Sequence, residues 1–123
     1  MTYTFTIQGR LAGLNEIIDE NRKGYHAGAR QKKDEQFLIK LQARHLPAMK
    51  EPVSIHYTWY EPNRKRDWDN IMAAQKFVQD ALVESHKLKN DGWNNICGIS
   101  HDFAVDAENP RVVVTITDSE FED

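Results

Sequence analysis

Two aspartates separated by a single residue, Asp67 and Asp69, are the side chains of this sequence best suited to chemistry. In an extended segment, residues two apart point to the same side, so both carboxylates could face one metal ion. Hard oxygen ligands of this kind suit Mg²⁺, and Mn²⁺ can substitute for it. The alternative is structural: Asp69 would cap a following helix, and Asp67 would add favourable negative charge at the same N-terminus.

Basic side chains stand directly before the aspartate pair and also earlier in the chain. The candidate phosphate contacts are Arg64, Lys65, Arg66, Arg30, Lys32 and Lys33. The net charge is −3, yet the part up to Arg66 is net positive and the remainder is net negative. Such asymmetry indicates contact with nucleic acid, whereas the alternative is a solvated surface with an acidic tail. Carboxylates for a metal beside cations for phosphates suggest a metal-dependent phosphodiesterase acting on nucleic acid.

Two further residues could join this chemistry. Lys76 lies seven residues after Asp69, which returns to the same face of a helix, and it could neutralise charge that develops on a phosphate. The alternative is a surface ion pair between Lys76 and Asp80, one helical turn apart. Asp91 could supply a third metal ligand from the loop after that helix, although Asn90-Asp91-Gly92 is also ordinary turn chemistry.

The elements that must position these residues can be read from hydrophobic periodicity. Four segments have the alternation or the β-rich composition typical of strands: residues 2–8, 53–59, 96–105 and 111–117. Two segments have helical periodicity: residues 29–46, and a stretch from about 69 or 70 to about 84 or 86. Residues 9–30 are expected to form a loop with a helical turn or two.

Each predicted helix has an expected buried face. The first should bury Phe37, Leu38, Leu41 and Leu46, and Pro47 should stop it. The second should bury the arc Ile71, Ala74, Phe77, Val78, Ala81 and Leu82. Strands and helices interleave without strict βαβ alternation, so we predict a single small α+β domain with a mixed or antiparallel sheet and two main helices. The domain should span residues 1–118, with an acidic tail at 119–123.

Composition limits the remaining possibilities. A chain of 123 residues with 40% hydrophobic content can bury one substantial core. A single cysteine, Cys97, cannot form an internal disulfide and is typical of a reducing cytoplasm, and the scattered histidines offer no zinc-ligand spacing. No apolar run has membrane-spanning length and no signal peptide opens the chain, so we expect a cytoplasmic protein with no membrane partner.

The ordered combination of these motifs resembles the RusA family of Holliday-junction resolvases from phages and prophages. The resemblance rests on Arg66-Asp67-Trp68-Asp69-Asn70, Lys76, Asp80-Ala81-Leu82, Asn90-Asp91 and residues 109–116. The opening segment, residues 9–33, is similar to the family branch common in phages of Gram-positive bacteria. The resemblance spans nearly the whole chain, and it implies the family's fold.

The resemblance also implies an activity: a homodimeric, Mg²⁺-dependent endonuclease that makes paired symmetric nicks across a four-way DNA junction. By position, Asp67, Asp69 and Asp91 match the family's metal-binding acids and Lys76 matches its catalytic lysine. In the shorter family form the lysine follows the second aspartate by four residues, a position that Ala73 occupies here. Three alternatives stay open: a branched-DNA-binding protein without catalysis, a phosphodiesterase for other branched nucleic acids, and a structural phage protein.

Overall fold

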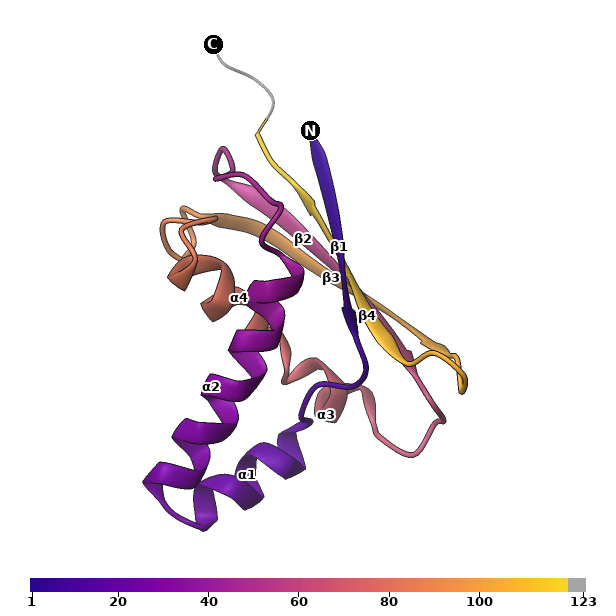
Figure 1. The fold of residues 1–123 in the computed structure, drawn as a ribbon. Helices are drawn as coiled ribbons and strands as arrows, with labels where there is room; N and C mark the ends of the chain where they lie inside the picture. Colours follow the sequence, from indigo (N-terminus) through magenta and orange to yellow (C-terminus); the bar gives the residue numbers. More distant parts are fainter. Residues whose placement is uncertain (120–123) are drawn as a thin grey trace.

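A four-stranded sheet forms one layer of the protein, and helices lie together on one side of it (Figure 1). The computed structural model describes residues 1–119. The strands are β1 (Thr2–Gln8), β2 (Val53–Glu61), β3 (Ile96–Val105) and β4 (Arg111–Thr117). The helices are α1 (Leu14–Arg22), α2 (Tyr25–Gln42), α3 (Trp68–Met72) and α4 (Gln75–Glu84). None of these helices is long and apolar enough to cross a membrane.

The order of strands in the sheet is β1-β4-β2-β3. β4 pairs antiparallel with both β1 and β2, whereas β2 and β3 run parallel. The prediction of an α+β domain with a mixed sheet is therefore confirmed, and three of the four predicted strands have the expected bounds. β2 extends two residues further than predicted, to Glu61.

The hydrophobic core lies between the helices and one face of the sheet. Alternate residues of the two central strands are buried there because successive side chains of a strand point to opposite faces. The core residues of these strands are Val53, Ile55, Tyr57, Trp59, Val112, Val114 and Ile116. The predicted apolar arc of residues 71–82 packs against them, since all six of its members are buried.

The segment between β1 and β2 is more helical than predicted. The expected loop at residues 9–30 contains α1 and the beginning of α2, which starts at Tyr25 rather than Ala29. α2 also ends at Gln42, before the predicted stop at Pro47. The loop prediction was wrong because Gly13 and Gly24, which suggested irregular structure, sit at the N-caps of the two helices and not inside a long loop.

The predicted buried stripe of α2 is also wrong in part. Phe37 and Leu41 are 68% and 44% exposed, whereas the buried residues of the helix are Gln36 and Ile39. Leu46 is buried as expected, but it lies beyond the helix end. The inward face of α2 includes the polar Gln36, and hydrophobic periodicity counts only apolar positions, so this face was not predicted.

The helix predicted across residues 69–86 is broken in two at Ala73 and Ala74. The backbone N–H groups of Ala74 and Phe77 bond three residues back, to Ile71 and Ala74, at 3.3 and 3.0 Å. Such tighter turns change the direction and rotation of the chain between α3 and α4. The predicted acidic tail, apart from Ser119, lies outside the described residues.

Candidate functional site

The aspartate pair is placed at the beginning of α3. Asp67 occupies the N-cap position in an extended conformation, with φ −72° and ψ 159°, and its side chain makes no capping hydrogen bond. Asp69 lies in the first turn of the helix, and both side chains are exposed. The structural alternative is therefore wrong in that Asp69 does not cap the helix, whereas both acids do lie at its N-terminus, where negative charge is favourable. Both carboxylates are free to take a ligand.

A cavity of about 940 Å³ lies beside the aspartate pair. It is bounded by the segment from the end of β2 into α3 and by the last residues of β3. Its charged and aromatic lining consists of Glu61, Arg64, Arg66, Asp67, Trp68, Asp69 and Phe103. Glu61, a 7% exposed carboxylate, was not among the predicted site residues, although it continues the inward-facing alternation of β2. The cavity thus combines exposed carboxylates with cations, the mixture that a metal-bound phosphate requires.

Lys76 belongs to a second polar cluster, on the first turn of α4. Its Nζ lies 3.1 Å from Asp80 Oδ1 and 3.0 Å from Asp91 Oδ2. The Nζ of Lys32, on α2, lies 3.3 Å from the other carboxylate oxygen of Asp80. The hydrogen bonds to Asp91 and Asp80 raise the pKa of Lys76 above its ordinary value, so the side chain is a cation and not a base at neutral pH.

Asp91 stands apart from the other two predicted metal ligands. It lines a different cavity, of about 350 Å³, together with Trp93 and residues 96–99 at the N-terminal end of β3. Asp67 and Asp69 face residues 103–105 at the C-terminal end of the same strand. Within residues 1–119 of one chain, no group of three or more His, Cys, Asp or Glu side chains is arranged to hold a metal ion. The three acids are therefore not brought together within the part of the chain that the structure describes.

The predicted phosphate contacts differ in how available they are. Arg64 and Lys65 are exposed beside the aspartate pair, and Arg30 and Lys33 are exposed on α2. Lys32 is engaged by Asp80. Arg66 is the most enclosed of the group, with a side chain that is 15% exposed and paired with Glu16 of α1. The sequence alone could not separate these cations, because pairing depends on segments distant along the chain.

Apolar side chains of β3 lie on the same face of the sheet as the core residues of β2, but on this edge strand they remain exposed to solvent. Ile99 and Val105 are 45% and 50% exposed. Trp68 is 66% exposed and stacks on Phe103, with ring centroids 4.8 Å apart and planes within 1°. Trp93, before the strand, is 99% exposed. Exposed apolar groups gathered along one edge strand mark an interaction surface.

An exposed carboxylate pair beside cations, carried by a small α+β domain, is typical of a metal-dependent nuclease. Residues 21–117 match the family model described as Endodeoxyribonuclease RusA. Because this match covers more than half of the chain, the protein belongs to the RusA family of endodeoxyribonucleases. The resemblance noted in the sequence is thereby confirmed. The search among curated proteins finds no match for this chain.

Proposed function

We propose that this protein is a Mg²⁺-dependent, structure-selective endodeoxyribonuclease that resolves four-way DNA junctions by paired symmetric nicks. Membership of the RusA family supports nuclease activity. The single observation that carries the proposal further is the cavity in which Asp67 and Asp69 are both exposed, next to Arg64. This arrangement offers oxygen ligands to a hard cation and positive charge to the phosphate that the cation would hold.

The donor set is suited to Mg²⁺, with Mn²⁺ as a substitute. Asp67 and Asp69 present carboxylate oxygens, and no thiol or imidazole lines their cavity. A bound divalent cation would lower the pKa of a coordinated water and stabilise charge on the phosphate. Both carboxylates line the same cavity, so the protein's own contribution would be to present them to one cation. Arg64 and Lys65 would bind the flanking phosphates.

Lys76 has the charge state that a phosphate-stabilising residue needs. Its side chain is 65% exposed and stays protonated, because Asp80 and Asp91 hold the ammonium. A fixed cation of this kind can neutralise negative charge that grows during phosphodiester cleavage. Because Lys76 donates a hydrogen bond to Asp91, the lysine would be close to any phosphate that approaches Asp91.

A homodimer would account for the separation of the acids. β3 is an edge strand of ten residues, and its exposed apolar side chains favour burial against a partner. A two-fold axis near the middle of β3 would pair this strand antiparallel with its copy. The N-terminal end of one β3 would then lie beside the C-terminal end of the other. Asp91 of the partner subunit would thus approach Asp67 and Asp69, and each dimer would contain two equal sites.

A cleavage assay tests the proposal directly. The protein is incubated with an end-labelled four-way junction, a flapped duplex and a linear duplex of matched sequence, each with Mg²⁺, with Ca²⁺ and with chelator. We expect symmetric nicks in the junction with Mg²⁺ alone, and Ca²⁺ should support binding with little cleavage. Equal cutting of the linear duplex would refute junction selectivity. Metal-independent binding without any cleavage would instead identify a branched-DNA-binding protein.

A further inference from the structure

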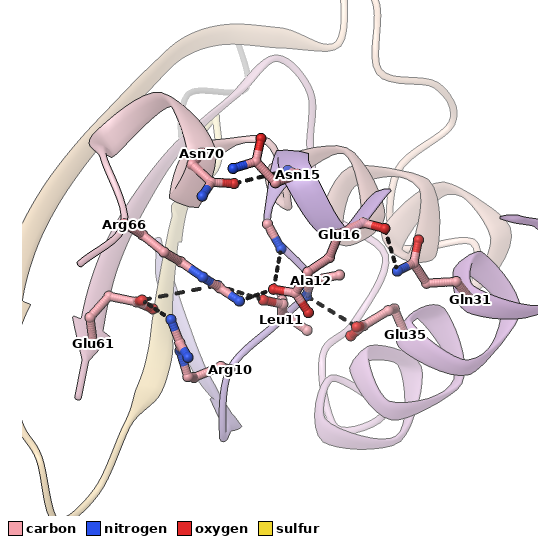
Figure 2. Close-up of polar contacts among 11 residues, drawn as sticks. Arg10, Leu11, Ala12, Asn15, Glu16, Gln31, Glu35, Glu61, Arg66 and Asn70 are labelled. Atoms are coloured by element: carbon pink, nitrogen blue, oxygen red, sulfur yellow. Dashed lines mark hydrogen bonds and ion pairs between the residues drawn. The ribbon is translucent and has the colours of Figure 1, made fainter. Parts of the chain in front are cut away.

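The residues immediately before and after the aspartate pair are both tied to the same distant segment of the chain. Arg66 precedes Asp67, and Asn70 follows Asp69. Figure 2 shows that both side chains reach the stretch from Arg10 to Glu16, which leads from β1 into α1. The two aspartates therefore lie between two anchoring points that are only four residues apart.

The first anchoring point is the guanidinium of Arg66. Its Nη1 donates to the backbone carbonyl of Leu11 at 3.1 Å, and its Nη2 pairs with Glu16 Oε1. Glu61 Oε1 lies 4.0 Å from the Nη1 of Arg66, and the same oxygen lies 2.9 Å from the Nη2 of Arg10. A planar guanidinium can serve several acceptors in fixed directions, which an ammonium cannot do. Arg66 is thus directed into the protein and not toward solvent.

The second anchoring point is the amide of Asn70. Its Oδ1 accepts a hydrogen bond from the backbone N–H of Asn15 at 3.1 Å, in the first turn of α1. Space for this contact exists because residue 13 is a glycine. A Cβ on Gly13 would stand 2.6 Å from Asn70 Oδ1 and 3.1 Å from the Asn70 carbonyl. The close approach of α3 to the start of α1 thus requires both residues.

The anchoring segment is itself fixed to the rest of the domain. The backbone N–H of Ala12 donates to Glu35 Oε1 on α2 at 3.1 Å, and the N–H of Gly13 donates to Glu16 Oε1 at 3.3 Å. Leu11 and Ala12 are buried in the core. A side chain attached to this segment is therefore attached to a rigid part of the protein.

We propose that Arg66 and Asn70 are positioning residues, which hold the backbone of Asp67 and Asp69 in the orientation that a divalent cation requires. This inference rests on the proposed metal-dependent function. Two exposed carboxylates that share one cation repel each other before it binds, so an unanchored pair would spread apart. Groups that orient metal ligands typically contribute about 10- to 100-fold to metal affinity or activity.

The inference assigns Arg66 a role that differs from that of its basic neighbours. A phosphate contact adds about 0.9 to the salt slope of DNA binding, whereas an internal anchor adds nothing to it. Arg64, exposed two residues earlier, is the matched control. Substitution of Arg66 should therefore lower metal affinity without changing the salt slope, and substitution of Arg64 should lower the salt slope without changing metal affinity.

The experiment measures two quantities on the full-length protein: Mn²⁺ affinity without DNA, by calorimetry, and the salt dependence of junction binding with Ca²⁺. We expect Arg66→Ala and Asn70→Leu to weaken Mn²⁺ binding by about 10- to 100-fold, with the salt slope unchanged. Asn70→Leu keeps the number of side-chain heavy atoms and removes the hydrogen-bonding groups of the amide, including the Oδ1 acceptor. Arg64→Ala should lower the slope by about 0.9 and leave Mn²⁺ affinity unchanged.

Two milder variants cover the case in which Arg66→Ala fails to fold. Gly13→Ala replaces no polar side chain, but its Cβ would displace Asn70, so it should reproduce the loss of Mn²⁺ affinity. Arg66→Lys keeps the positive charge but cannot bind both the Leu11 carbonyl and Glu16 in the same geometry, so it should lose most of the Mn²⁺ affinity as well. Wild-type Mn²⁺ affinity in folded Asn70→Leu and Gly13→Ala, or a reduced salt slope in Arg66→Lys, would overturn the inference. A wild-type protein that neither binds Mn²⁺ nor cleaves junctions would overturn the proposed function with it.

Discussion

Lys76 Nζ lies 3.0 Å from Asp91 Oδ2, so the first turn of α4 is joined to the loop before β3. The cluster also includes Asp80, whose carboxylate lies 3.1 Å from the same ammonium. The predicted catalytic lysine is thus grouped with the third predicted acid and not with the pair on α3. The pair Asp67 and Asp69 at the C-terminal end of β3 and the cluster with Lys76 and Asp91 at its N-terminal end can therefore be tested separately.

The role of Lys76 can be separated from that of an ordinary ion pair. Lys76→Ala should reduce the single-turnover rate of junction cleavage by about 10²-fold, the range for loss of one charge-stabilising group. Because the side chain is exposed, the free energy of unfolding should change by less than about 1 kcal/mol. Lys32→Ala is the control, since it removes the other cation bound to Asp80. Normal cleavage by Lys76→Ala would make the lysine a surface residue.

Mixed dimers test whether each site draws acids from both subunits. Asp69→Asn and Asp91→Asn should each abolish cleavage and retain junction binding, because each removes one proposed metal ligand and no proposed phosphate contact. A heterodimer with Asp69→Asn in one subunit and Asp91→Asn in the other would have both defects in one composite site and none in the other. We expect such a heterodimer, isolated with two affinity tags, to nick one strand. If every site lay within one protomer, the heterodimer would be inactive.

The exposed cations should determine the salt dependence of DNA binding. Replacing Arg64 and Lys65 with alanine should reduce the slope of log affinity against log salt by about 0.9 for each phosphate that the variant no longer binds. Arg30→Ala with Lys33→Ala applies the same test to α2. Fluorescence anisotropy with a labelled junction at several salt concentrations measures both slopes. An unchanged slope in one pair of substitutions excludes that segment from the DNA surface.

The β3 surface should control dimerisation. Ile99→Lys and Val105→Lys place charge on the exposed apolar side chains of this strand, where a two-fold related copy would bring like charges together. The dissociation constant of the dimer should rise by about tenfold or more, measured by sedimentation equilibrium, and cleavage should fall in parallel. Phe37→Lys, at an exposed position of α2, is the control because it adds the same charge away from β3. Dimers that persist in both β3 variants would locate the interface elsewhere.

The half-buried carboxyl of Glu35 should make stability depend on pH. Burial raises the pKa of this group above its ordinary value, although the N–H of Ala12 opposes the shift. The folded protein therefore takes up a proton at a higher pH than the unfolded chain, and stability falls as the pH rises between the two pKa values. Glu35→Gln retains an acceptor for Ala12, so it should increase the free energy of unfolding at about pH 7 and have less effect below about pH 4. Urea denaturation at the two pH values measures the change in unfolding free energy that Glu35→Gln causes. Equal changes at both pH values would contradict a raised pKa for Glu35.

The sequence by itself determined the strands and the chemical character of the site. Three strands have the predicted bounds because alternation is a local pattern, set by side chains that point to opposite faces of a sheet. The pair Asp67 and Asp69 was recognisable because both carboxylates lie within three residues, so no folding was needed to bring them together. The helices were predicted less well, since the inward face of α2 includes the polar Gln36.

Only the tertiary structure decided which charged groups are available and which are engaged. Arg66 belongs to the same run of three basic residues as Arg64, yet its contacts with Glu16 and Leu11 direct it into the domain. Asp91 lies at the opposite end of β3 from the acid pair, a separation that follows from the parallel pairing of β2 and β3. Contacts of this kind join residues far apart along the chain. Their geometry is set by the packing of whole elements, which short-range patterns do not encode.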